Sequence, residues 1–462
     1  MRGSRSRLRQ RMRNTDAGGN MTVSPVVSRV SPRMRRMQWI AIGLATAAIA
    51  LNYVDRSTLA IGNVTIRQEF GINATAIGAL QSFWAITYAC FQIPVGFLLD
   101  RLGPRYLVGL ALVAWSAAQA AGGLAAGYTQ LMWARIALGA TESPAFPGAV
   151  RVTSDWFHVK DRGRPTGVYN SGGSIGPAIA PPLLTGLMLA FGWRTMFVTM
   201  GVAGLFGALV WFMVYRDPAK TVLEPQDEAY LAENRAAEAP VELRNWVRLF
   251  RFRSMWGLML GAFCTGYAVW MYQTWLPAYL EMQQHISIAK TGFLAMIPLV
   301  FSVFGAWAGG WVTDRLAGGG MEIVASRRLP SILGLLASGL FTVVATTAGN
   351  AVEAVIFISA AMFFLSLGIA GKWTLITAVA PQSYCTSVAS IQNFGGYIGG
   401  TVSPLVTGIV VDLTGSFVVA LAIGAGITII GAVILQTVVR SPISSEALEA
   451  AGPVRGPLAT GA

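Results

Sequence analysis

Four charged residues stand inside apolar segments, where a charge is costly, and their types indicate chemistry. Asp55 and Arg56 end the run WIAIGLATAAIALNYV, and Arg135 and Glu142 share the later run ARIALGATE. Ionised groups at bilayer depth are rare and mark functional sites. A guanidinium stays protonated and offers a planar fork that fits a carboxylate, whereas a buried carboxyl can gain or lose a proton. The four residues therefore suit anion binding combined with proton carriage.

Helical spacing predicts how the first pair is presented. In a helix of 3.6 residues per turn, Asn52 and Arg56 lie on one face with Tyr53 beside them. Asp55 projects about 100° away from Arg56. We expect Arg56, with Tyr53, to bind an anion and Asp55 to carry a proton. A static Asp–Arg structural pair is the alternative.

The second pair is separated by almost two helical turns. Arg135 and Glu142 lie about 10.5 Å apart along a helix and on the same face. This separation is too long for easy direct contact, so we expect each to have a partner on another helix. Pro144 and Pro147 follow, and they can kink the helix and free carbonyl groups around a cavity. A buried ion pair that fixes helix register is the alternative.

Lys372 is a third intramembrane cation, in GIAGKWTLITAVAP. It could bind a second carboxylate, or it could extend towards the cytoplasm as lysines near helix ends do. The spans then hold three cations against two acids, which favours an anionic ligand. Neutral polar and aromatic side chains are candidates for the remaining lining, with plain packing as the alternative for the aromatic ones. These candidates are Tyr88, Tyr272, Gln273, Trp373 and Asn393.

The segments that must position these residues are membrane spans. The chain of 462 residues is 54% hydrophobic and only 12% charged, and apolar stretches of about 20 residues are long enough to cross a bilayer as helices. We predict an all-α membrane protein with twelve transmembrane helices. The expected spans are 38–62, 75–99, 105–126, 129–150, 166–190, 194–215, 254–280, 290–313, 329–348, 353–379, 385–411 and 416–438.

The distribution of basic residues predicts topology. Of 34 lysines and arginines, 28 fall in segments that would share one side of the membrane, which places both termini in the cytoplasm by the positive-inside rule. This placement explains the net charge of +13 without nucleic acid. The predicted organisation is a disordered basic tail (1–37), two six-helix bundles (38–215 and 254–439) joined by a cytoplasmic linker (216–253), and a C-terminal tail (440–462).

A weak internal repeat supports two related halves. GFLLDRLGPR (96–105) and GGWVTDRLAG (309–318) each follow the second span of a half. Glycines there permit a close approach or a tight turn, and the charged residues could hold one half against the other until transport breaks the contact. Arginines that only anchor topology are the alternative. The candidate gating residues are Gly96, Asp100, Arg101 and Arg105. Glycine clusters at 172–176 and 395–400 indicate helices that slide or pack closely.

At these motifs the chain resembles the major facilitator superfamily. The pattern at 96–105 looks like its signature loop, and four further stretches are similar to the anion:cation symporter family of sugar-acid and organic-anion transporters. They are NYVDRSTLAIG (52–62), RIALGATESPAFPGAV (135–150), WLPAYL (275–280) and IQNFGGYIGGTVSPLVTG (391–408). The resemblance implies that Asp55 and Glu142 are the protonatable pair, Arg135 biases them, and Arg56 binds the substrate carboxylate. Lys372 has no fixed role in that family.

The leading hypothesis is a proton-coupled importer of a sugar acid or other carboxylate, without a cofactor or metal, working as a monomer in the bacterial inner membrane. An exchanger, a uniporter and a non-transporting nutrient sensor on the same fold are the alternatives. An enzyme is not expected, because the two histidines lie in predicted loops and no metal-binding or catalytic motif is present. The three cysteines, all within spans, argue against a disulfide framework.

Overall fold

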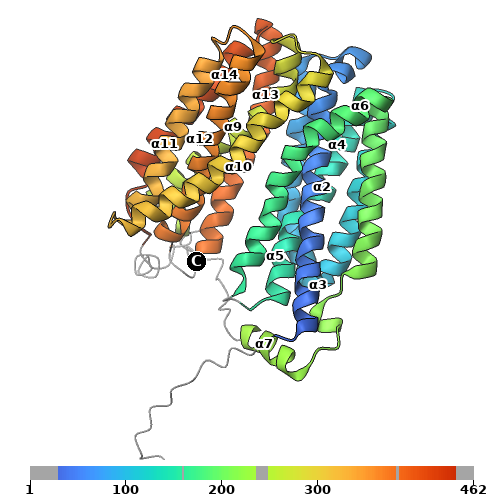
Figure 1. The fold of residues 1–462 in the computed structure, drawn as a ribbon, viewed down its shortest axis with the longest axis vertical. Coiled ribbons are helices and arrows are strands. Elements are labelled where there is room, and N and C mark those ends of the chain that lie inside the picture. Colours follow the sequence, from blue (N-terminus) through green and yellow to red (C-terminus); the bar gives the residue numbers. More distant parts are fainter. Residues whose placement is uncertain (1–29, 159–160, 236–247, 381–383, 444–462) are drawn as a thin grey trace, which may run out of the picture.

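The computed structural model describes residues 30–158, 161–235, 248–380 and 384–443. Every regular element within these ranges is a helix, and the helices form two bundles that stand side by side (Figure 1). The N-terminal half contains α2 (Pro32–Phe70), α3 (Ala74–Gly123), α4 (Tyr128–Glu142), α5 (Ala145–Trp156) and α6 (Gly163–Val214). The C-terminal half contains α9 (Arg253–Met282), α10 (Ile288–Gly318), α11 (Ile323–Ala345), α12 (Ala351–Val379), α13 (Cys385–Thr414) and α14 (Phe417–Val438). The segment that connects the halves along the chain contains η2 (Pro218–Lys220), α7 (Pro225–Arg235) and η3 (Leu249–Arg251).

Two of the long helices are interrupted by a glycine with a left-handed backbone. Gly103 divides α3 at φ 73°, and Gly192 divides α6 at φ 81°, a conformation that glycine adopts without steric cost. The expected kink near Pro144 is also present, because α4 ends at Glu142 and α5 begins at Ala145. Within the described residues, nine helices are long and apolar enough to cross a membrane by length and composition.

The first helix begins earlier than the sequence predicted. α2 starts at Pro32 instead of residue 38, because Ser31 caps it by accepting a hydrogen bond from the Met34 N–H at 3.1 Å. Ser31 also donates from its backbone N–H and its hydroxyl to the Asp227 carboxylate, at 2.9 and 2.7 Å. The α7 helix is thereby held against the start of α2 at the bottom of Figure 1.

The glycine clusters pack within the halves and not between them. A Cβ atom added to Gly176 of α6 would clash with the Ala50 carbonyl of α2, and one added to Gly399 of α13 would clash with the Phe263 carbonyl of α9. These are equivalent helix pairs, fifth on first and eleventh on seventh in the predicted order of spans. Of the two alternatives for these clusters, close packing is the one that this structure bears out, and it joins helices within each bundle.

Contacts between the halves gather at the end of the molecule far from α7. Asp412 of α13 accepts hydrogen bonds from the backbone N–H groups of Ala74 and Thr75, at 2.9 and 2.7 Å, where α3 begins. A Cβ atom at Gly78 of α3 would clash with the Pro404 carbonyl of α13. One half thus caps a helix of the other, and their backbones meet closely there.

The loop with the repeated motif binds its own half in this conformation. The Arg105 guanidinium donates to the Phe212 carbonyl at 2.8 Å and to the Tyr215 carbonyl, both at the end of α6. Gly103 provides the predicted turn, and Gly96 has open space where a Cβ would stand, so no close approach forms there in this conformation. The Arg101 guanidinium lies over the Phe97 ring of its own half, and the side chain of Asp100 lies outside the described residues.

Candidate functional site

Arg56 occupies an aromatic enclosure near the middle of α2. Its guanidinium carbon lies 4.6 Å from the ring centre of Tyr53, 4.5 Å from that of Trp84 and 4.8 Å from that of Tyr88. Tyr53 stands one helical turn before Arg56, and Trp84 and Tyr88 are one turn apart on α3. Ring faces attract a cation and remove water from it. The guanidinium is therefore held in place while its charge remains available to a ligand.

Glu142 at the end of α4 is the ionic partner of Arg56. Its Oε2 atom accepts a hydrogen bond from Arg56 Nε at 3.3 Å and another from Trp84 Nε1 at 3.0 Å. Glu142 is fully buried, and its Oε1 atom has no hydrogen-bond partner among the described residues. The pair is consequently incomplete on the acid side, and a proton could be accommodated there.

Asp55 lies inside the N-terminal bundle, away from Arg56 along the helix circumference. The residue is fully buried, and within the described ranges neither carboxylate oxygen receives a hydrogen bond. It interacts electrostatically with Glu142, Arg135 and Arg56. Burial of an unpaired charge costs several kcal/mol, so Asp55 has the surroundings of a group that exchanges a proton. The static Asp55–Arg56 ion pair considered from the sequence is absent from the described contacts.

Arg135 completes the buried cluster from α4. It is 1% exposed and donates from one terminal nitrogen to Gln81 Oε1 of α3 at 2.7 Å. The prediction that Arg135 and Glu142 each have a partner on another helix is thus confirmed, since Glu142 bonds to Arg56 of α2. The cluster joins α2, α3 and α4 around two acids and two guanidinium groups.

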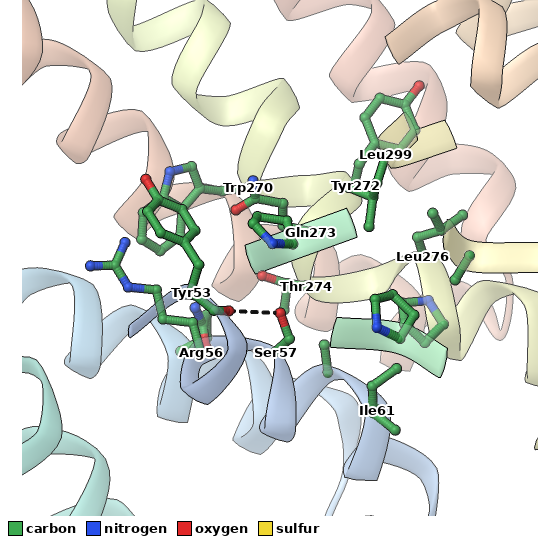
Figure 2. A pocket seen from close by; sticks show the side chains of 16 residues that line it. Tyr53, Arg56, Ser57, Ile61, Trp270, Tyr272, Gln273, Thr274, Leu276 and Leu299 are labelled. Atoms are coloured by element: carbon green, nitrogen blue, oxygen red, sulfur yellow. Dashed lines mark hydrogen bonds between the residues drawn. The ribbon is translucent and has the colours of Figure 1, made fainter. Parts of the chain in front are cut away.

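Two adjoining cavities meet at Arg56, between the halves of the molecule. The smaller, of about 40 Å³, reaches towards Ile61 and Leu299 and is drawn in Figure 2. The larger, of about 220 Å³, extends along the C-terminal half. Four residues line both cavities: Tyr53, Arg56, Trp270 and Gln273. Figure 2 shows Tyr53 and Arg56 beside Trp270, with the Tyr53 carbonyl accepting a hydrogen bond from Ser57 at 3.0 Å.

Most of the predicted lining residues face the larger cavity. Lys372 and Trp373 of α12 and Asn393 of α13 line it opposite Arg56. Tyr88 lies beneath Arg56, fully buried against the Tyr397 ring at 5.2 Å between centroids. Lys372, Trp373 and Asn393 are therefore placed to contact a ligand, whereas Tyr88 lines neither of these two cavities and contacts Arg56 instead. The binding roles remain predictions.

Tyr272 is placed differently from its neighbour Gln273. Its hydroxyl points away from Arg56 (Figure 2) and forms a 2.6 Å hydrogen bond with Thr342 of α11. Residues adjacent in a helix face directions about 100° apart, and here the Tyr272 hydroxyl faces α11 while Gln273 lines both cavities. The hydroxyl of Tyr272 fastens α9 to α11, although the residue contributes to the wall of the smaller cavity.

Sequence reasoning missed several aromatic and amide residues of the site. Trp84 stacks on Tyr88 at 5.4 Å and on Trp270 at 5.3 Å between ring centres, so it contacts both halves. A one-turn spacing from Tyr88 could have indicated Trp84, and the same spacing from Asn393 could have indicated Tyr397. Gln81 had no comparable signal.

The architecture and motifs agree with comparisons to known proteins. The Major Facilitator Superfamily profile matches residues 45–384. The chain belongs to the Major Facilitator Superfamily. It is 41% identical to the protein named "Probable L-galactonate transporter" of Escherichia coli strain K12, over 90% of this chain and 92% of that one. It is 30% identical to the D-galactonate transporter of Escherichia coli O6:H1, over 86% and 94% of the two chains.

A solved structure supports the fold of this superfamily member. A bacterial homologue of the human lysosomal transporter Spinster, in an inward-facing and unoccupied conformation, aligns with a TM-score of 0.70. The alignment covers 87% of this chain and 95% of that one, at 19% identity, so the likeness concerns the fold alone. The protein is a transporter and not an enzyme, and it is a multi-pass protein of the bacterial inner membrane.

Proposed function

We propose that the protein imports an organic anion of the sugar-acid class together with protons. The observation that carries this proposal is Arg56, a permanent cation held by three aromatic rings at a cavity between the halves. A guanidinium presents the geometry that carboxylates prefer. Gln273 and Asn393 in the same cavity supply amides for hydroxyl groups, and Trp270 and Trp373 supply faces for C–H groups. The names of the similar proteins include two galactonate transporters.

Proton coupling would proceed through Glu142 and Asp55. When Glu142 accepts a proton, its attraction for Arg56 weakens, and the guanidinium is freed for a substrate carboxylate. When Asp55 and Glu142 are both ionised, they balance the guanidinium groups of Arg56 and Arg135. Each proton taken up by an acid therefore adds one positive charge to the cluster. An arriving anion removes this excess. Proton binding and anion binding thereby favour each other.

Alternating access would exchange the contacts that close one end of the cavity. Asp412 capping α3, and the α3–α13 contact at Gly78 and Pro404, close the end far from α7. Opening to that side would break them, and the Arg105 loop would approach the C-terminal half at the other end. A carrier that moves between two such closed states exposes its site to one side at a time.

The proposed topology has twelve spans in two six-helix bundles with both termini in the cytoplasm. The breaks at Gly103 and Gly192 divide α3 and α6 into two segments each, and α4 with α5 forms the fourth span. The α9 helix of 30 residues, which includes Gln273, is the seventh. One chain holds the complete cavity between its two halves, so a monomer suffices for transport.

The test is substrate-driven acidification in liposomes. Purified protein is reconstituted with a trapped pH dye and an imposed potential, negative inside, and single sugar acids are added outside. We expect one acid to acidify the lumen faster than in protein-free liposomes and faster than with an Arg56→Ala variant. Uptake of labelled acid without acidification would instead indicate a uniporter. Counterflow alone would indicate an exchanger, and no movement of any acid would favour a nutrient sensor.

A further inference from the structure

We infer that Lys372 forms a second anion subsite opposite Arg56, and that the cavity selects an acid with two anionic groups. The two cations come from different halves, Arg56 from α2 and Lys372 from α12, and line the same cavity of about 220 Å³. This inference rests on the proposed function, because it names the class of anion that the same cavity takes.

The charges around the two cations differ. Arg56 has Glu142 as its ionic partner at 3.3 Å. Lys372 has no carboxylate, hydrogen bond or ion pair among the described residues, although it is only 8% exposed. The residues that line this cavity include no aspartate or glutamate. A buried ammonium group without a counter-charge is unfavourable, so an anion from outside the protein is the group that would neutralise it.

The position of Lys372 does not fit extension towards water. A lysine that extends to an aqueous surface exposes much of its side chain, whereas Lys372 is only 8% exposed and lines the cavity. Its helix is also packed tightly there, since a Cβ atom at the preceding residue, Gly371, would meet the Ser331 hydroxyl of α11 at 2.6 Å. The packing holds this turn of α12 against α11 and fixes the stem of Lys372 beside the cavity.

The lining between the cations suits a hydroxylated chain. Gln273 and Asn393 offer amides, and Trp373, at 44% exposure, offers an aromatic face. An acid with a carboxylate at each end could place one on Arg56 and one on Lys372, with hydroxyl groups at the amides. A monocarboxylate would leave one cation unneutralised once Glu142 holds a proton. The favoured class is therefore an aldaric acid or a similar dicarboxylate.

Matched acid pairs test the inference on the full-length purified protein. Galactonate with galactarate, and gluconate with glucarate, differ only in whether the last carbon is a primary alcohol or a carboxylate. We expect the wild type to bind a dicarboxylate at least about tenfold more tightly than its partner, because a lost charge pair costs a tenfold change or more. Lys372→Met should abolish that preference by weakening dicarboxylate binding at least about tenfold more than monocarboxylate binding, and Lys372→Arg should restore it.

Each outcome separates this inference from the proposed function. Retained monocarboxylate binding shows that Lys372→Met is folded, and Lys372→Gln serves as a second neutral variant if it is not. Equal weakening of both acids in the neutral variants, or a wild-type preference for the monocarboxylate, would overturn the second subsite and leave the proposed function intact. A wild type that binds no acid of either class, or whose binding is unchanged in Arg56→Ala, would overturn both the second subsite and the proposed function.

Discussion

Glu142 accepts a hydrogen bond from the Nε atom of Arg56 at 3.3 Å, and the two residues lie on different helices of the N-terminal half. Both side chains are buried, and only the guanidinium lines the cavities. The pair thus connects a group that can hold a proton, inside the bundle, to a group that can bind an anion, at the cavity. A change in either one must be felt by the other.

Replacing Arg56 by lysine should abolish substrate binding although the charge is kept. An ammonium cannot stack on the rings of Tyr53, Trp84 and Tyr88 or donate a planar fork. Loss of the hydrogen-bonded charge contact to a bound carboxylate costs about 2–5 kcal/mol, which is roughly 30-fold or more in affinity. Equilibrium binding to the purified variant measures the loss, with Arg33→Lys at an exposed site as the control. Affinity within threefold of wild type would contradict the role of Arg56.

Replacing Glu142 by glutamine should make binding less dependent on pH. The amide has the shape of a protonated carboxyl and carries no charge, so Arg56 is free at every pH. We expect wild-type affinity to fall as the pH rises, because an ionised Glu142 competes for Arg56, and the affinity of Glu142→Gln to fall less steeply, because only Asp55 still responds. Titration of binding from mildly acidic to mildly alkaline pH measures both. A variant whose affinity falls with pH as steeply as that of wild type would show that another group senses the proton.

Removing the Asp412 carboxylate should favour opening at the end far from α7. Asp412 caps α3 across the halves, and a cap contributes about 0.5–2 kcal/mol, or roughly a 2- to 30-fold shift in the population. Labelling of Ile61→Cys, in a background without native cysteines, by an impermeant thiol reagent from outside measures the shift in Asp412→Ala. Glu228→Ala, which removes an exposed acid of α7, is the control. Unchanged labelling would mean that the cap does not hold this end closed.

Replacing Tyr230 by phenylalanine should loosen α7 from the N-terminal half. The Tyr230 hydroxyl donates to Asp161 at 2.7 Å and accepts from the His158 N–H at 2.9 Å, and each bond contributes about 1 kcal/mol. Thermal unfolding in detergent should show a lower Tm for Tyr230→Phe and no change for Tyr106→Phe, an exposed control.

The Tyr230 contribution should also depend on pH. Burial, together with the hydrogen bond to Asp161, raises the pKa of Tyr230 above its ordinary value. A raised pKa in the folded state stabilises the protein fully below the unfolded value of about 10, and this contribution disappears as the pH rises through the folded value. The difference in Tm between wild type and Tyr230→Phe should therefore stay constant up to pH ~9. A difference that shrinks at neutral pH would contradict this assignment.

Much of the fold follows from hydrophobic length, and the exceptions follow from caps and turns. Long apolar stretches identify helices because the bilayer offers no water to the backbone N–H and C=O groups, which must then bond to each other within a helix. Hydropathy does not show where a helix starts outside the apolar segment. The Ser31 cap starts α2 at Pro32, and hydropathy therefore placed the start too late, at residue 38. Ser31 followed by proline was a usable signal for that start. Gly176 and Gly399 predicted close packing, but a single sequence does not state which helix approaches them.

The candidate site was predictable where a charged residue stands in an apolar segment and its burial is unfavourable. Asp55, Arg56 and Lys372 are conspicuous because charge is rare at that depth. Partners supplied by other helices, such as Gln81 for Arg135, leave no trace in the periodicity of either helix. Tyr272 shows the complementary limit, since one helical position decides whether a side chain faces the cavity or, as here, Thr342 of α11.

The central claim is that Asp55 moves the proton while Arg56 binds the anion, and paired flux measurements on Asp55→Asn test it most directly. Proteoliposomes are loaded either with unlabelled substrate, to measure counterflow, or with buffer under an inward proton gradient, to measure accumulation. We predict that Asp55→Asn retains counterflow close to wild type and loses accumulation, whereas Arg56→Lys loses both. Accumulation by Asp55→Asn at the wild-type level, or loss of both fluxes despite correct folding, would contradict the separation of the two roles.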